Sequence, residues 1–472
     1  MNIIDNAEGL LICLYVAPPH GEGEYKNKIV QENFNALKDA GVDVVMGCNE
    51  AFSAPLDESE CFKSLDMCAK AGLKYFVLDE LNMEFISTEC DTRRKIFKTL
   101  TDEEKKNLLD RYAASLEKYI RHEACAGVKF VDEFGWEQME GIKYAKDYFE
   151  KKYPDKVFYV NFLGYNVSDA EYLYGFYGAQ HAAEYRIPEM SQAQCNYETK
   201  ISRYNIFANK ALDTLGIKWF TQDSYCMEPI GEGTETAVDC INVCLYEMSS
   251  YLAMVKRKRG IKVGNYIQDG HWDKTVRREL TQAEFDLQVN ICIAYGMDSV
   301  MIFTGCCPIE YYGLTGDSGL IDKKGELSPS YYYLKILKRQ IRATDKYLHG
   351  ATFTGILTKG EFKSLQPADL TGIKWNDAIF TGKLPAETLI ESFDGILDVE
   401  ATSQCVIGCF KYGKDRICYL VNNSIATAAN YTVKLDKPRE ITVVADGATE
   451  VIFSDEIKIY GLPAGESTLF KY

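Results

Sequence analysis

The sequence lacks an excess of basic residues and any long apolar run. Its 53 Lys and Arg residues are outnumbered by 69 Asp and Glu residues, which gives a formal net charge of −16 and a pI near 5.0. Nucleic acids and anionic membranes bind basic surfaces, so we expect neither as a partner. No apolar stretch reaches the roughly 20 residues that span a bilayer, and no basic region precedes the short apolar run at the amino terminus. We therefore expect a cytoplasmic protein.

Patterns typical of metal sites, disulfides and nucleotide binding are also missing. The chain has five histidines, of which His20 and His271 alone are expected near the ends of predicted strands. Its 16 cysteines include no Cys-x-x-Cys pair, so we interpret them as thiols of a reducing compartment. No Gly-x-Gly-x-x-Gly motif follows a strand, which argues against a dinucleotide-binding fold. We expect no metal ion and no cofactor.

What the sequence does contain is a series of eight short β-type runs separated by helical patterns. This alternation predicts an α/β protein in which a parallel sheet is surrounded by helices. Eight repeats favour a closed TIM (β/α)8 barrel over an open sheet, and we place this barrel at residues 1–348. The predicted strands are residues 11–17, 42–48, 74–78, 128–131, 157–161, 218–222, 262–268 and 299–304.

The pattern changes after a last barrel helix, predicted at residues 331–347. Short alternating runs then follow, with turn signals between them, and they predict a small antiparallel β-sandwich over residues 349–472. This region has few candidate catalytic groups, so a structural or substrate-flanking role is expected. Its predicted strands are residues 405–410, 416–421, 431–435, 441–444 and 457–460.

The fourth predicted strand ends in two adjacent carboxylates, Asp132 and Glu133. One interpretation is that Asp132 caps the next helix while Glu133 lies in its first turn, where negative charge is favourable. The alternative is catalytic, because the residues that follow the strands of a β/α barrel meet at one face and form its active site. The position of the pair on one of eight strands favours the catalytic interpretation.

Carboxylates, amides and aromatic side chains dominate the other predicted strand ends. Acids and amides pair with sugar hydroxyls, aromatic rings stack on sugar rings, and two carboxylates supply the acid and the base or nucleophile of glycoside cleavage. We therefore expect an oligosaccharide or glycoside as the partner, whereas the number of subunits stays open. The expected catalytic residues are Glu133, Asp132, Asp223 and Asp269, and the expected substrate contacts are Glu50, Glu80, Trp136, Asn161, Gln222, Tyr225, Gln268 and Trp272.

In layout the chain resembles the clan A glycoside hydrolases that carry a β-sandwich, such as the family 42 β-galactosidase-like proteins. In that clan the general acid/base is a Glu preceded by Asn at the end of the fourth strand, and the matching residues here are Glu133 and Asp132. The clan's nucleophile is a Glu at the end of the seventh strand, where this chain has Gln268, which cannot form a glycosyl ester. The resemblance implies that Glu133 is the general acid/base and leaves its partner open between Asp223, Asp269 and Asp132 itself.

The Asp-Glu pair is also similar to that of the substrate-assisted hexosaminidases of families 20 and 123. In those enzymes the Asp orients a 2-acetamido group whose oxygen replaces the protein nucleophile, which would account for Gln268. Residues 222–225 would then hold the sugar. A barrel that binds oligosaccharide without cleaving it is the alternative from another class. A lyase or isomerase of sugar phosphates is less favoured, because Glu310 and Asp317 make the loop after the eighth strand a poor phosphate site.

Overall fold

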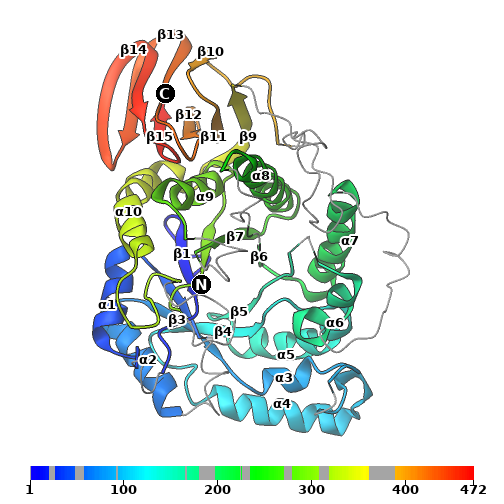
Figure 1. The fold of residues 1–472 in the computed structure, drawn as a ribbon. Helices are drawn as coiled ribbons and strands as arrows, with labels where there is room; N and C mark the ends of the chain where they lie inside the picture. The colour runs from blue at the N-terminus through cyan, green and yellow to red at the C-terminus, as the bar shows by residue number, and fades with distance from the viewer. Residues whose placement is uncertain are drawn as a thin grey trace.

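The computed structural model describes residues 2–20, 27–47, 58–91, 94–164, 167–179, 197–223, 225, 234–269, 279–307, 318–360 and 388–472. Its first part is a parallel sheet with the strand order β5-β4-β3-β2-β1-β8-β7-β6, which is rolled into a nearly closed barrel (Figure 1). This confirms the predicted fold class. The strands are β1 (Leu11–Tyr15), β2 (Val44–Met46), β3 (Lys74–Leu78), β4 (Cys125–Val131), β5 (Val157–Val160), β6 (Trp219–Gln222), β7 (Lys262–Gln268) and β8 (Ser299–Phe303).

The barrel closes between β5 and β6. Phe162 forms a parallel bridge with Gln222, and its backbone N–H donates to the carbonyl oxygen of Thr221 at 3.1 Å. The hydroxyls of Tyr159 and Thr221 lie 2.8 Å apart and join the same two strands. All residues of β1, β4 and β5 are buried, as expected where helices cover the outer face of a parallel barrel.

Helices surround the barrel, and several begin or end at residues that cap a helix. Thr101 and Thr281 each form a reciprocal capping box with the glutamate three residues later. Gly41, with φ of 103°, ends the helix before β2 in the left-handed conformation that favours glycine. The helices are α1 (Gln31–Ala40), α2 (Glu58–Ala71), α3 (Asn82–Phe85), η2 (Phe97–Thr99), α4 (Asp102–Leu116), η3 (Trp136–Gln138), α5 (Met139–Lys152), α6 (Asp169–Ala179), α7 (Tyr197–Leu215), α8 (Thr234–Arg259), α9 (Gln282–Ala294) and α10 (Pro329–Leu348).

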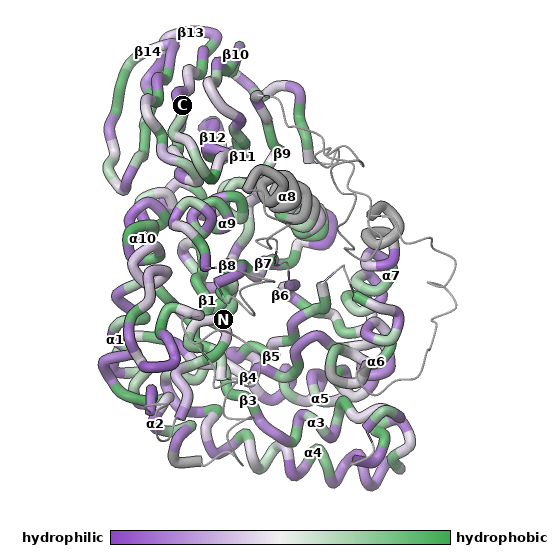
Figure 2. Tube along the Cα trace, viewed as in Figure 1, coloured by the Kyte–Doolittle hydropathy of each residue, from purple (hydrophilic) through white to green (hydrophobic). Residues whose placement is uncertain are grey.

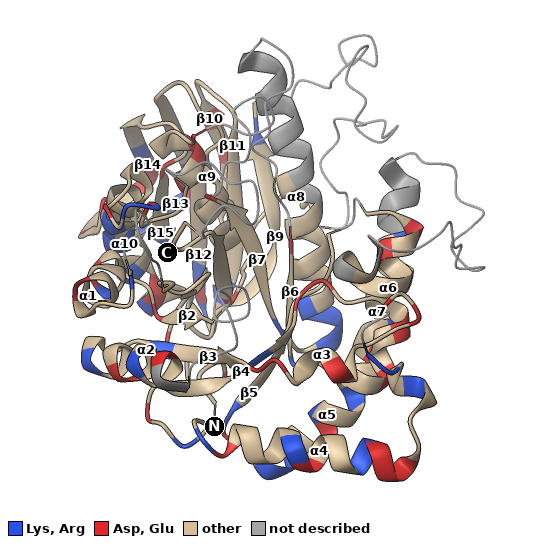
Figure 3. Ribbon diagram, turned by 60° about the horizontal axis from the view of Figure 1, so that its bottom comes forward, with Lys and Arg blue, Asp and Glu red and all other residues tan. Residues whose placement is uncertain are grey.

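The outer helix α10 is amphipathic. In α10 the buried residues Leu334, Leu337 and Ile341 recur at helical spacing, and hydrophobic and hydrophilic residues alternate along the outer helices (Figure 2). Charged residues of both signs lie side by side on these helices (Figure 3). Within the described ranges, no helix is both long enough and apolar enough to cross a membrane.

The carboxyl-terminal part is an antiparallel sheet of seven strands. The long strand β13 pairs through its first half with β10 and through its second half with β15, so the sheet curls over a core of its own. The predicted strands at 431–435 and 441–444 are both parts of β13. The strands are β9 (Thr352–Lys359), β10 (Ile396–Ala401), β11 (Cys405–Tyr412), β12 (Asp415–Asn422), β13 (Ala429–Ala445), β14 (Ala448–Leu462) and β15 (Ser467–Lys471).

This sheet packs directly on α9 and α10. A Cβ atom at Gly408 would lie 2.1 Å from the carbonyl oxygen of Ala294, so the strand needs glycine to approach α9 this closely. Asn290 of α9 donates to the carbonyl oxygen of Gly465 at 2.8 Å and accepts from the hydroxyl of Tyr419 at 2.7 Å. Residues on one face of the sheet thus belong to the hydrophobic core of the barrel, whereas residues on its other face form the separate core of the sheet. A division into two domains between residues 348 and 349 stays a prediction.

Candidate active site

The chain turns sharply at the carboxyl end of β4. Glu133 has a φ of 50°, a left-handed conformation that is uncommon outside glycine. Its N–H donates to the carbonyl oxygen of Asn161 at 3.1 Å, and its own carbonyl oxygen accepts from Phe176 at 3.0 Å. Asp132 does not cap a helix, because the next helical segment, η3, begins at Trp136 after Gly135. A strained conformation that is fixed from both sides is typical of functional sites.

Asn161, directly after β5, connects the ends of three strands. Its side-chain amide donates to Oδ1 of Asp132 at 3.0 Å and to Oδ1 of Asp223 at 2.7 Å. Its own Oδ1 accepts from the hydroxyl of Thr221 at 2.9 Å. Because both amide hydrogens and the oxygen are used, Asn161 has one orientation and holds the two carboxylates at fixed positions.

Glu133 and Asp223 are hydrogen bonded to each other through their side chains. Burial, together with the charges of Asp223 and Asp132, raises the pKa of Glu133 well above its usual range. Burial and the charge of Asp132 raise the pKa of Asp223 to about 7, although hydrogen bonds from Asn161 and Glu133 act in the opposite direction. Two touching carboxyl groups resist ionising together, so the pair retains a proton to a higher pH than an isolated carboxyl group would.

Both carboxylate oxygens of Asp132 accept hydrogen bonds. Oδ1 accepts from Asn161, and Oδ2 accepts from the hydroxyl of Tyr15 in β1. The ammonium group of Lys129 in β4 donates to that same Tyr15 hydroxyl and lies 4.0 Å from Oδ2 of Asp132. The sequence analysis missed Lys129 and Tyr15. A lysine in the middle of an otherwise apolar strand was the available signal, because an unpaired lysine is almost never buried.

Aromatic side chains line the barrel next to this network. Tyr15 packs against Tyr266 and Phe303, with ring centroids 5.7 Å apart in both pairs. Tyr225 lies against Phe303 at 5.5 Å, at the same end of the barrel. The hydroxyl of Tyr266 is 3.0 Å from that of Tyr159. Of the aromatic substrate contacts predicted from the sequence, Tyr225 is thus connected to Tyr15 through the ring of Phe303.

The residues at the end of β7, Gln268 and Asp269, form contacts other than those of Asn161. Asp269 is buried and hydrogen bonded to Ser330 in the first turn of α10, and burial raises its pKa to about 7. The groups that shift the pKa of Glu133 include Asp223 and Asp132 but not Asp269. Gln268 is fully buried, and its backbone exchanges hydrogen bonds with the side chain of Gln288 at 2.9 and 3.2 Å.

The remaining predicted residues are dispersed. Gln222 is fully buried and donates to Oδ1 of Asn265 at 3.2 Å, inside the barrel. Glu80 is exposed. Trp136 is half-buried, and its ring centroid lies 5.6 Å from the ammonium group of Lys210 on α7. Glu50 and Trp272 lie outside the described residues, as do Ser224 and His271.

Asp79 shows why an acid at a strand end is not always part of the site. It directly follows β3, as Asp132 follows β4, but it is buried against α4. Its Oδ2 accepts from the hydroxyl of Tyr119 and from that of Ser115 at 2.5 Å. Asp79 therefore attaches a helix to the barrel.

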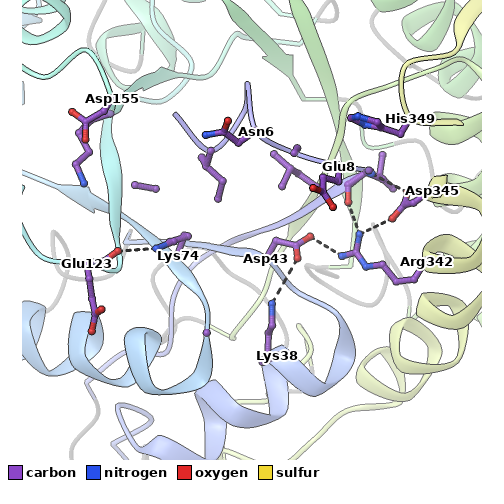
Figure 4. Close-up of a pocket in the computed structure, with 18 of the residues that line it drawn as sticks. Asn6, Glu8, Lys38, Asp43, Lys74, Glu123, Asp155, Arg342, Asp345 and His349 are labelled. Atoms are coloured by element: carbon purple, nitrogen blue, oxygen red, sulfur yellow. Dashed lines mark hydrogen bonds and ion pairs between the residues drawn. The ribbon is translucent and has the colours of Figure 1, made fainter. Parts of the chain in front are cut away.

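A hollow of about 970 Å³ lies at the opposite, amino-terminal end of the strands (Figure 4). Arg342 of α10 is central to it and donates to Asp43 at 2.7 Å and to Asp345 at 3.0 Å, as well as to the carbonyl oxygens of Leu10 and Gly41. These bonds attach α10 to the residues that precede β1 and β2. The amino-terminal face of such a barrel serves stability, whereas the carboxyl-terminal face carries chemistry.

The chain matches no protein-family model and no curated protein sequence. Its structure is similar to that of a catalytic mutant of Gan42B, a GH42 β-galactosidase from G. stearothermophilus, with a TM-score of 0.52 at 10% identity over 99% of this chain and 98% of that one. This likeness supports a parallel β/α barrel followed by an antiparallel sheet. A β-galactosidase from Bacillus circulans sp. alkalophilus also matches, with a TM-score of 0.50 at 8% identity over 98% of this chain and 99% of that one. Likeness at this identity shows the fold alone.

A third match is shorter. It is a β-galactosidase from the psychrophilic Marinomonas ef1, with a TM-score of 0.44 at 12% identity over 72% of this chain. The chain spans 62% of that protein's length. This likeness adds no argument about function, which must come from the site itself.

Proposed function

We propose that the protein is a glycoside hydrolase in which Glu133 is the general acid/base and Asp223 is the second catalytic carboxylate. The hydrogen bond between their side chains, at the carboxyl ends of β4 and β6, is the observation that carries this proposal. Glu133 holds a proton that it can give to a glycosidic oxygen, because its pKa is raised by burial and by two neighbouring carboxylates. Asp223 is the partner that ionises first.

Three observations favour Asp223 over the other acids as the partner of Glu133. Both oxygens of Asp132 already accept hydrogen bonds from Tyr15 and Asn161. Asp269 is bonded to Ser330 instead. Of these three acids, Asp223 is the one whose side chain is hydrogen bonded to Glu133.

The contact between the two carboxyl groups also favours retention of the anomeric configuration. Inverting enzymes hold their carboxyl groups about 6.5–9.5 Å apart to admit water, whereas retaining enzymes hold them about 5–5.5 Å apart. Carboxyl groups in hydrogen-bonding contact leave no room for that water and are nearer to the retaining gap than to the inverting one. Asp223 then attacks the anomeric carbon and forms a glycosyl ester while Glu133 protonates the leaving oxygen. In the second step Glu133 takes a proton from the water that hydrolyses the ester.

The contacts of Asp132 argue against the substrate-assisted mechanism. In that mechanism an Asp at this position orients a 2-acetamido group, but here its oxygens are engaged by Tyr15 and Asn161. Binding without cleavage is the competing function. It is favoured by Gln268, a residue that cannot act as a nucleophile at the end of β7.

The experiment that separates these functions measures phenol release from aryl glycosides of several sugars in both anomeric forms. A glycosidase releases phenol from at least one of them with saturation kinetics. A binding protein shows saturable affinity for a glycoside or oligosaccharide and releases no phenol, and this outcome would refute the proposed hydrolase. Activity confined to 2-acetamido sugars would support the substrate-assisted alternative.

A further inference from the structure

Lys129 lies inside the barrel, in the middle of β4. Its side chain is only 3% exposed. Its ammonium group donates to the hydroxyl of Tyr15 and lies 3.6 Å from the centroid of that ring. Since β1 and β4 are not neighbours in the sheet, this contact crosses the barrel interior. Burying a lysine is costly unless its charge is paired, so the position calls for a reason.

Hydrogen bonds connect Lys129 to the candidate catalytic pair. The Tyr15 hydroxyl accepts from Lys129 and donates to Oδ2 of Asp132. Asn161 then bridges Oδ1 of Asp132 to Oδ1 of Asp223. Tyr15 has a single hydroxyl hydrogen and Asn161 has two amide hydrogens, so these contacts use every polar hydrogen of both side chains. The direction of each bond is therefore fixed.

The charges of this network are unequal. Asp132, Asp223 and Glu133 bring three carboxyl groups, and Lys129 brings one ammonium group. The Asp132 carboxylate raises the pKa of both Glu133 and Asp223, whereas the Lys129 charge lowers that of Asp223. Among the described residues, other titratable groups act on the pair or are shifted by it. They include Glu171 of α6, whose charge raises the pKa of Glu133, and the phenols Tyr159 of β5 and Tyr266 of β7, whose own pKa values are raised by burial and by these carboxylates.

We propose that Lys129, acting through Tyr15 and Asp132, is a positioning residue that limits the Glu133–Asp223 pair to one proton and thereby sets the acidic limit of activity. This inference rests on the proposed function. The Tyr15 bond holds Asp132 oriented toward Asn161, and the ammonium charge of Lys129 balances the negative charge that Asp223 must carry as a nucleophile. Without Lys129, the Glu133–Asp223 pair binds its second proton at a higher pH. That proton goes to Asp223, which then loses its nucleophilic form.

The test compares the pH profiles of kcat/KM for Lys129→Met, Tyr15→Phe and the wild type. We expect the acidic limb of Lys129→Met to move toward higher pH by about one unit, as expected when a nearby opposite charge is lost. Tyr15→Phe keeps both the ring and Lys129 but breaks the hydrogen bond, so its limb moves in the same direction by less. The matched control is Lys146→Met. Lys146 is a buried lysine on the outer helix α5 that is paired with Glu150 at 2.7 Å, and its loss leaves the limb in place.

A second readout does not depend on activity. Carbon-13 NMR of labelled aspartate follows the Asp223 carboxyl directly, with the Asp223→Asn spectrum as the assignment. We expect its titration midpoint to rise in both Lys129→Met and Tyr15→Phe and to stay unchanged in Lys146→Met. A uniform loss of activity with unchanged limbs and an unchanged midpoint would mean that Lys129 only supports the fold, and would overturn the inference. Should Lys129→Met not fold, an unshifted midpoint in Tyr15→Phe overturns it equally. If the wild type cleaves no glycoside but both variants show the raised titration midpoint of Asp223, the proposed function is refuted. The effect of Lys129 on Asp223 would then still hold.

Discussion

The carboxyl group of Glu133 is hydrogen bonded to that of Asp223, although the two residues follow different strands of the barrel. Their contact places one proton between two acids at the face where β/α barrels carry out chemistry. The side-chain amide of Asn161 donates a hydrogen bond to Asp223, and Glu133 itself has a left-handed backbone conformation. The chemical account of the protein depends on this pair.

Replacing Glu133 by Gln tests the proton donor. The amide keeps the shape but cannot protonate a leaving oxygen, so we expect turnover of an unactivated glycoside to fall by about 10²–10⁴-fold. An aryl glycoside with a good leaving group needs less protonation and will lose less activity in the first step. Glu140→Gln is the matched control, because Glu140 is an exposed acid of the outer helix α5 that pairs with Lys105. Equal activities of Glu133→Gln and the wild type would remove Glu133 from the mechanism.

The pH dependence of kcat/KM follows from the same two groups. Asp223 must be ionised, and its pKa is raised to about 7, so activity is lost as the pH falls below neutrality. Glu133 must be protonated, and its pKa is raised well above the usual range, so activity is lost again at alkaline pH. We expect a bell-shaped profile with its maximum above pH 7, in which the limbs report the pair as a whole. A profile that stays flat down to pH 5 would be incompatible with this assignment.

The sequence could predict the frame of the site but not the directions of its side chains. The strands are apolar runs that end at polar or small residues, and their order alone places Asp79, Asp132, Asp223 and Asp269 after strand ends. Asp79 and Asp269 then turn toward α4 and α10, whereas Asp132 and Asp223 turn toward Asn161.

The strand geometry explains part of this difficulty. The pairing of β4 with β5 shifts register between Lys129 and Val131, so simple alternation cannot give the direction of Asp132. The contact of Lys129 with Tyr15 crosses the barrel between strands that are far apart in the sequence. Such contacts exist only in the closed barrel.

The buried carboxyl group of Asp269 is expected to make the free energy of unfolding depend on pH. An aspartate in an unfolded chain has a pKa of about 4, whereas burial raises the pKa of Asp269 to about 7. Below pH 4 the group is protonated in both states and burial has no electrostatic cost. As the pH rises from 4 to 7, the unfolded chain releases its proton first, so the folded state loses stability. Asp269→Asn removes this loss and should raise the free energy of unfolding by ~1–3 kcal/mol at pH 8, with little difference at pH 4.

Thermal unfolding at the two pH values measures this effect. The control is Asp110→Asn, which removes an exposed acid of α4 that pairs with Lys106, a kind of interaction that contributes little to stability. A lower Tm of Asp269→Asn at pH 8 would show that the charged form of Asp269 is stabilised in the fold.

The central claim, that Glu133 and Asp223 are the acid/base and the nucleophile of a glycosidase, is tested most directly by trapping the glycosyl ester. A 2-deoxy-2-fluoro aryl glycoside of the sugar that the enzyme cleaves slows both steps, and a good leaving group lets the ester accumulate. Mass spectrometry of the digested protein is expected to find one added sugar on the peptide that contains Asp223. Asp223→Asn should take up no label, whereas Glu133→Gln should still form the ester and hydrolyse it more slowly. Label on Asp269 or Asp132, or hydrolysis with inversion and no label at all, would contradict the account.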